Sequence, residues 1–119
     1  MEKIEFETYK RPNGHDEFLE WVTALPIKDR AKLLRTIKET EVNGLLVAQR
    51  LKWVKKIDTN LYELRSKVGS NIQRGLYFHV ENGRYVITHG FTKKSEKTTK
   101  KEIDHAKELR KEWFENEDR

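Results

Sequence analysis

The first part of the chain alternates between polar and apolar residues, at first with the period of a strand and then with that of a helix. Residues 2–9 place Ile4, Phe6 and Thr8 on one side with glutamates between them, which predicts a half-buried strand. The residues Arg-Pro-Asn-Gly at 11–14 break this pattern. Between residues 15 and 25 the apolar residues have helical spacing, which predicts an amphipathic helix: Phe18, Trp21, Val22 and Leu25.

A second helix is predicted after Pro26, with its end at Asn43-Gly44, because glycine commonly follows the last residue of a helix. Its apolar residues also repeat at helical spacing: Ile27, Ala31, Leu34 and Ile37. Since Pro26 joins the two helices directly, we expect them to form an antiparallel helical hairpin.

From about residue 51 the pattern becomes that of strands. Residues 51–57 and 61–67 are predicted strands, and Asp58-Thr59-Asn60 is the polar turn between them. Two further runs, 71–80 and 84–91, flank Glu81-Asn82-Gly83. An Asn-Gly pair between alternating apolar runs is a strong signal for a β-hairpin.

The C-terminal part is predicted to be a helix that opens with Thr99 and Glu102 at the spacing of a capping box. Its apolar stripe consists of Ile103, Ala106, Leu109 and Trp113, and we expect the polar tail from Glu115 onward to fray. The resulting order, β-α-α-β-β-β-β-α, predicts a single α+β domain over residues 1–119. A mostly antiparallel, twisted sheet is then packed by the helical hairpin and the C-terminal helix.

Composition limits the classes of protein that this chain can belong to. The 119 residues include no cysteine, which excludes disulfides, thiolate zinc sites and cysteine nucleophiles. No stretch approaches the roughly 20 apolar residues of a membrane-spanning helix, and the N-terminus lacks an apolar signal core. We therefore expect a soluble, cytoplasmic protein. The helical Trp21 and Trp113 have two interpretations, as core residues or as part of a partner surface.

The chain is basic, with a formal net charge of +5 and a pI of about 9.4. A basic excess favours binding to polyanions such as nucleic acid, although a lysine-rich solvated surface explains the total charge equally well. The distribution favours nucleic acid, because residues 92–101 (TKKSEKTTKK) carry lysines that are almost uncompensated.

The hairpin pattern places polar residues at one end of the predicted sheet. With Asn82-Gly83 as a two-residue loop, the paired positions are Val80 with Tyr85, Phe78 with Ile87, Leu76 with His89, and Arg74 with Phe91. One face is then apolar near the turn and carries Arg74, His89 and Phe91 at its far end. A buried arginine is costly unless it is paired or lines an opening. We therefore expect a groove there, or an Arg74 side chain that reaches water from a strand end.

Cations and aromatic rings near this end form the predicted site, because phosphate and base recognition need both. Arginine and lysine can stabilise charge on a phosphate under attack, and a tuned lysine, histidine or tyrosine can move protons. The candidate catalytic residues are Arg65, Arg74, Tyr77, His89, Lys93 and Lys94. The candidate RNA-binding residues are His79, Phe91, Lys97, Lys100 and Lys101.

Several kinds of chemistry are not expected. The sequence has no carboxylate cluster with metal-ligand spacing and its histidines are scattered, so we expect no metal cofactor and disfavour a two-metal nuclease. Glycine-rich nucleotide-binding loops are absent, and we expect no other cofactor. His105 lies in a helix with alternating charges and is expected to be exposed.

Residues 61–109 resemble toxins of the RelE/ParE superfamily, and most closely the HigB-like (phage Gp49-like) branch. The shared features are the strands YELR and RGLYF, the segment HGFTKKSEKT and the helix that follows it. The resemblance implies a RelE-like fold and a small bacterial toxin of a type II toxin–antitoxin system. It implies that the protein binds the ribosomal A site and cuts mRNA without a metal, through attack of the ribose 2′-OH on the scissile phosphate. It also implies a helix-turn-helix, HigA-like antitoxin through which the complex binds operator DNA.

Carried over residue by residue, the resemblance matches Arg74 to the strand arginine that contacts the scissile phosphate, and Arg65 to the preceding basic strand position. Lys93, Lys94 and Lys97 fall in the segment where relatives carry basic catalytic or phosphate-binding groups. Residues 95–101 contain neither the tyrosine nor the histidine that some relatives have there. The general base is therefore left open among His89, Tyr77, His79, a lysine and the ribosome itself.

Two other functions fit the same pattern. A ParE-like toxin would inhibit DNA gyrase without cleaving RNA, and the shared fold does not distinguish the two. A basic nucleic-acid-binding module without catalysis would lose affinity steeply with salt and leave RNA intact.

Overall fold

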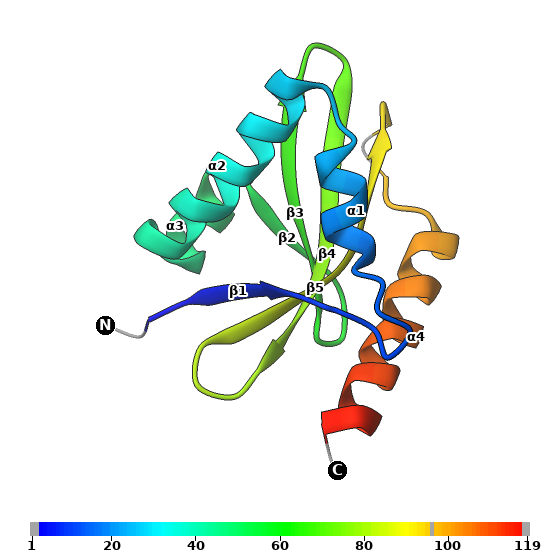
Figure 1. Cartoon of the computed structure of the whole chain (residues 1–119). Helices are drawn as coiled ribbons and strands as arrows, with labels where there is room; N and C mark the ends of the chain where they lie inside the picture. Colours follow the sequence, from blue (N-terminus) through cyan, green and yellow to red (C-terminus); the bar gives the residue numbers. More distant parts are fainter. Residues whose placement is uncertain (1–2, 96, 118–119) are drawn as a thin grey trace.

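The computed structural model describes residues 3–95 and 97–117 and consists of a five-stranded sheet with helices on both faces (Figure 1). The sheet order is β1-β5-β4-β3-β2, in which β1 is parallel to β5 and the other neighbours are antiparallel. The strands are β1 (Glu5–Thr8), β2 (Val54–Asp58), β3 (Leu61–Val68), β4 (Asn71–Val80) and β5 (Arg84–Lys93). The helices are α1 (Glu17–Thr23), α2 (Ile27–Asn43), α3 (Leu45–Arg50) and α4 (Lys100–Glu117). The predicted α+β class and mostly antiparallel sheet are confirmed.

The core is divided by the sheet, because neighbouring residues of a strand point to opposite faces. Tyr77 packs with Phe18 of α1 and Leu33 of α2 on one face. Phe78, the next residue, packs with Leu109 and Trp113 of α4 on the other. Trp113 is buried, and Trp21 packs against the first cluster, so the interpretation of both tryptophans as core residues is confirmed.

Helix α1 lies close to the sheet because two glycines pair beneath it, Gly75 of β4 with Gly90 of β5. A Cβ atom added at Gly90 would meet the ring of Trp21 at 2.2 Å, and one added at Gly75 would meet Phe18 at 3.0 Å. Two aromatic rings of α1 therefore fill the space that side chains at these strand positions would occupy.

The buried face of α2 differs from the predicted one. Ile27 is 75% exposed and Leu34 46%, whereas Leu33 is fully buried. Thr36 and Thr40 are also buried. Each of their hydroxyls donates a hydrogen bond to the backbone carbonyl of the residue four positions earlier. The apolar pattern misses this face because threonines that satisfy their hydroxyls within the helix can be buried at little cost.

The helices differ from the prediction in three further respects. The short α3 was not predicted and follows Gly44, where α2 ends as expected. Helices α1 and α2 diverge from Pro26 and pack mainly on β5 and β3 respectively, rather than along each other (Figure 1). The expected frayed tail from Glu115 is wrong as far as Glu117, which still belongs to α4, and residues 118–119 lie outside the described part.

The predicted hairpin register is correct at the far end and wrong near the turn. Arg74 pairs with Phe91 and Leu76 with His89, as expected. The register then shifts by one residue, and Phe78 pairs with Val86. A β-bulge between Leu76 and Tyr77 causes this shift, so the ladder closes on the three residues 81–83 rather than on two. Tyr85 and Ile87 consequently pack with Tyr77, on the face opposite to the predicted one.

We predict that Gly90→Ala lowers the free energy of unfolding by about 1–3 kcal/mol, because the new methyl group overlaps the Trp21 ring and overpacks the core. Urea unfolding measures the change, and Gly75→Ala should cost less because its contact with Phe18 is longer. In a Trp21→Ala background the effect of Gly90→Ala should largely disappear. An equal loss in both backgrounds would contradict the proposed close packing.

Candidate functional site

Arg74 is fully buried at the end of the sheet that carries the basic segment. Its Nη1 atom lies 3.5 Å from Oε2 of Glu63 and donates to the Thr98 hydroxyl at 3.1 Å, and its Nη2 atom donates to the Ser95 carbonyl. The expected open groove over Arg74 is therefore wrong, and so is the alternative in which its side chain reaches water. The guanidinium is stabilised by a carboxylate that the sequence analysis did not consider.

Glu63 is also the partner of Arg65. Nε and Nη2 of Arg65 donate to Glu63 Oε1 at 3.0 and 2.8 Å, and the Thr98 hydroxyl donates to Oε2. Arg65 and Arg74 are register partners on β3 and β4, so one carboxylate bridges the guanidinium groups of two neighbouring strands. We call Glu63, Arg65, Arg74 and Thr98 the arginine site. Its three charged groups carry a net charge of +1, and the Arg65 side chain is 18% exposed.

A second cationic feature lies beside Arg65. A cavity of about 220 Å³, lined in part by Arg65, Trp53 and three lysines, adjoins a larger depression on α2 that shares Trp53 with it. We call this surface the basic groove. Its cations and its aromatic residue are Lys28, Lys32, Arg35, Lys52, Trp53 and Lys67.

The basic groove is not evident from the sequence, because its residues come from α2, from the loop before β2 and from the end of β3. Only the folded chain brings these three segments together. One signal was present, since Lys28, Lys32 and Arg35 recur at the spacing of one helix face.

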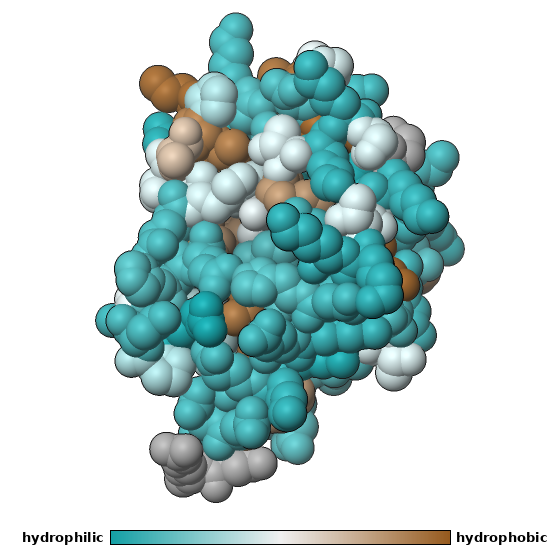
Figure 2. Space-filling view, turned by 90° about the vertical axis from the view of Figure 1, so that its right-hand side faces the viewer, coloured by the Kyte–Doolittle hydropathy of each residue, from teal (hydrophilic) through white to brown (hydrophobic). Residues whose placement is uncertain are grey.

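The basic segment after β5 encloses the arginine site. Lys93 is half-buried, whereas Lys94, Lys97 and Lys101 are exposed, and Glu96 lies outside the described residues. Lys100 forms an exposed ion pair with Asp104 at 2.7 Å, and this hydrogen bond raises the pKa of Lys100. Viewed from the side of α4, the lower half of the surface is mostly hydrophilic, and hydrophobic residues show in the upper part (Figure 2).

Three predicted site residues do not belong to the arginine site. Tyr77 lies on the opposite face, in contact with Phe6, Tyr62 and Tyr85, and burial raises its pKa, so it is a poor proton acceptor. His79 is near the hairpin turn, and its ring contacts that of Tyr85 at a tilted angle. Phe91 is buried against Leu61, Leu76 and Ala106 and belongs to the core.

His89 holds α4 against the sheet. Its Nε2 atom lies 3.2 Å from Glu102 Oε1, its Nδ1 atom lies 3.0 Å from the Thr88 hydroxyl, and its ring is 4.7 Å from that of His105. Burial lowers the pKa of His89 and favours the neutral ring, against the opposing effect of Glu102. His89 is therefore on the same face of the sheet as Arg74, but its side chain contacts residues of α4 rather than the arginine site.

The His89 contacts continue into an ion-pair network between α1 and α4. His105 pairs with Glu17 at 2.7 Å, Glu17 with Arg11 at 2.7 Å, and Arg11 with Glu112 at 3.0 Å. The expectation that His105 is merely exposed is therefore wrong. The pKa of Glu112 is lowered, chiefly by the hydrogen bond from Arg11.

Two further properties concern the described residues alone. Within residues 3–95 and 97–117, no three histidine, aspartate or glutamate side chains are grouped so that they could hold a metal ion. No helix in this part of the chain is long and apolar enough to cross a membrane.

A comparison with known protein families identifies the family of this chain. Residues 20–111 match the phage-derived Gp49-like proteins (DUF891), which is most of the chain. The chain belongs to the Gp49-like family. This family is part of the RelE/HigB-like toxin group of toxin–antitoxin systems, which implies a cognate antitoxin for this Gp49-like protein. A search of curated proteins found no match to the chain.

We predict that Glu63→Gln lowers the free energy of unfolding by about 3–5 kcal/mol, because it removes the negative charge between two arginines that are largely buried. Urea unfolding at neutral pH measures the loss. Lys100→Gln breaks an exposed ion pair of similar length and should leave stability nearly unchanged. Equal effects of the two substitutions would show that Glu63 does not stabilise the arginine site.

We predict that stability falls as the pH drops from about 7 to 5, because His89 must then be protonated in a buried position. The folded-state pKa of His89 is below its ordinary value of 6.5, so its contribution is present above that pH and is lost below it. Unfolding midpoints measured across this range should fall less for His89→Gln than for the unchanged protein. His15→Gln, at an exposed histidine, should retain the full decrease.

Proposed function

We propose that this Gp49-like protein is a ribosome-dependent mRNA endonuclease that cleaves without a metal and inhibits translation. The arginine site is the observation on which the proposal rests. Two guanidiniums from neighbouring strands are held side by side by one carboxylate, so together they can bind a phosphate. The basic groove beside Arg65 supplies further cations and Trp53, which suit an RNA strand that approaches this site.

The proposed reaction is attack of a ribose 2′-OH on the adjacent phosphorus. The 2′-O–P bond forms and the P–O5′ bond breaks, which gives a 2′,3′-cyclic phosphate and a free 5′-OH after one proton leaves the nucleophile and one reaches the leaving oxygen. Arg65 and Arg74 would stabilise the added negative charge on the phosphate. Glu63 contacts both arginines and is a carboxylate, so it is a candidate to accept the 2′-OH proton.

Arg74 must be uncovered before it can contact a phosphate. The Ser95 carbonyl and the Thr98 hydroxyl cover it, and both belong to the connection between β5 and α4. We infer that this connection moves away when RNA binds, and that phosphate oxygens then take the place of the Ser95 carbonyl as acceptors. Lys94 and Lys97 on the same connection are exposed and available to the neighbouring phosphates.

The remaining parts of the proposal follow from membership of a toxin family rather than from the geometry. A helix-turn-helix, HigA-like antitoxin would neutralise the protein, and the complex would bind operator DNA through the antitoxin. Action on translating ribosomes places the protein in the cytoplasm.

We predict that induced expression of the unchanged protein arrests growth and cuts an abundant mRNA at fixed positions within codons, as read by primer extension. Arg65→Gln and Arg74→Ala should abolish the cuts, since each removes one of the two cations at the scissile phosphate. Lys111→Gln removes an exposed charge of α4 and serves as the control that should still cut.

Arg74→Ala also removes a buried partner of Glu63, so its fold and antitoxin binding are checked in parallel. Arg65 is partly exposed, and its substitution provides a second test that is less sensitive to folding. Full cutting by folded forms of both variants would refute the site. Growth arrest with intact mRNA and signs of DNA damage would instead indicate a gyrase inhibitor, and binding without arrest a nucleic-acid-binding module.

A further inference from the structure

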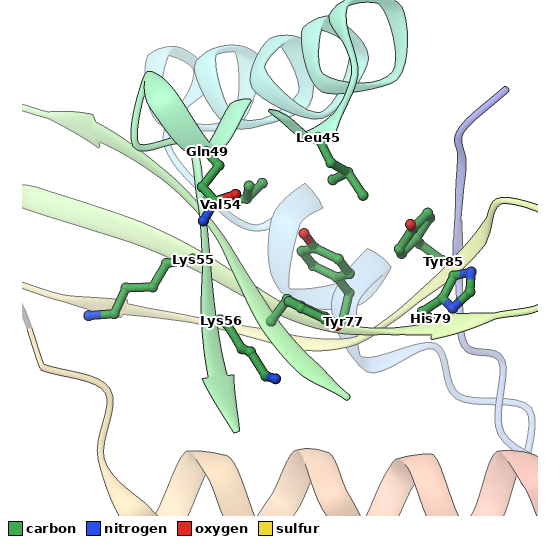
Figure 3. A pocket seen from close by; sticks show the side chains of 9 residues that line it. Leu45, Gln49, Val54, Lys55, Lys56, Tyr77, His79 and Tyr85 are labelled. Carbon is green, nitrogen blue, oxygen red and sulfur yellow. The ribbon is translucent and has the colours of Figure 1, made fainter. Parts of the chain in front are cut away.

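The face of the sheet opposite the arginine site has a cavity of about 360 Å³ (Figure 3). Three tyrosines from three neighbouring strands line it, Tyr62, Tyr77 and Tyr85, and Leu45 and Val54 contribute apolar walls. We call it the tyrosine cavity. Its size is within the range of about 300–1,000 Å³ that is common for small-molecule sites.

The hydroxyl of Tyr77 is directed into this cavity (Figure 3). Tyr77 is only 1% exposed, and its hydroxyl has no hydrogen-bond partner among the residues that the structure describes. Burial raises the pKa of Tyr77, so the group keeps its proton and remains a donor. The hydroxyl itself opens on the cavity, so a ligand with an acceptor atom at this point can accept its hydrogen bond.

The cavity walls suit a flat ring. Tyr62 is stacked on Tyr77 at a centroid distance of 5.3 Å, and Tyr85 meets Tyr77 edge-on at 5.7 Å. Tyr62 and Tyr85 are only partly buried, so each retains ring surface that a ligand can contact. Aromatic side chains in such positions stack on nucleobases without strong sequence preference.

Positive charge lies at the rim. Lys56 is the register partner of Tyr62, it is exposed, and it lines the cavity together with Lys55. His79, also exposed, adds a ring beside Tyr85. A ligand that fits has a flat ring with an acceptor for Tyr77 at one end and an anionic group for Lys56 at the other.

We propose that the tyrosine cavity binds a nucleotide, with the base against the exposed ring surfaces of the tyrosines and the phosphate near Lys56. The nucleotide can be free or a unit of single-stranded RNA, since both present the same chemistry. The site does not require cleavage at Arg74, because Arg74 faces α4 and the cavity opens on the other side of the sheet.

Titration of the whole protein with GMP, guanosine and a short single-stranded RNA, followed by NMR of the tyrosine and histidine rings, tests the proposal. GMP or the RNA should shift the resonances of Tyr62, Tyr77 and His79. Tyr77→Phe removes only the hydroxyl and should weaken binding about five- to tenfold, the usual effect of one hydrogen bond. It should leave the melting temperature unchanged, because the hydroxyl has no partner within the described chain.

The contribution of the positive charge of Lys56 is tested with a separate variant. Lys56→Gln should weaken GMP several-fold and guanosine hardly at all, whereas Lys111→Gln, on α4, should change neither. Binding of both GMP and RNA indicates a free-nucleotide site, and binding of RNA alone indicates a strand contact; either result supports the proposal. Absence of binding, or equal affinity in Tyr77→Phe, overturns it. Arg65→Gln should leave the GMP shifts intact, so failure of the arginine site and failure of this cavity can be distinguished.

Discussion

The shared carboxylate of Glu63 is the interaction on which the functional end of the fold depends. Two arginines on adjacent strands would repel each other in a largely dehydrated place, and Glu63 makes that placement possible. The arrangement keeps two guanidiniums oriented side by side before any substrate arrives. Such preorganisation is valuable for binding phosphate, because little reorganisation is then needed when negative charge develops.

Strand β5 carries residues that position helices on both faces of the sheet. On one face Gly90 lets α1 lie directly against the sheet. On the other, His89, the preceding residue, contacts Glu102 of α4. The pair of residues therefore fixes a helix on each side of a single strand. Beyond them β5 runs into the segment that covers Arg74, so the cover is attached to a strand that contacts a helix on each face.

Much of the fold could be predicted from the sequence, because it depends on local patterns. The strand and helix periods, the stop at Gly44 and the apolar stripe of α4 are all properties of short segments. The bulge after Leu76 could not be predicted, since one extra residue in a ladder leaves no local signature in an alternating run. The buried face of α2 was missed because its threonines look polar in sequence but satisfy their hydroxyls inside the helix.

The candidate site was only partly predictable for a related reason. Arg65 and Arg74 were identified, and the face of Arg74 was correct, because the register at that end follows directly from the hairpin. Their carboxylate partner was not identified, since Glu63 gains its meaning only when β3 lies against β4. Tyr77 was assigned to catalysis on its proximity in sequence, whereas strand alternation places it on the other side of the sheet from Arg74. Residues that act together from different strands can therefore be predicted only when the register between those strands is predicted correctly.

Closure of the arginine site is physically linked to the docking of α4. Thr98 contacts both Glu63 and Arg74, and α4 begins at Lys100, two residues later. Glu102, in the first turn of that helix, is the partner of His89. The connection is short. If it moved away from Arg74 while the first turn of α4 stayed in place, the residues between them would be strained. Interactions that hold α4, including the His105–Glu17 pair, therefore also oppose exposure of the arginine site.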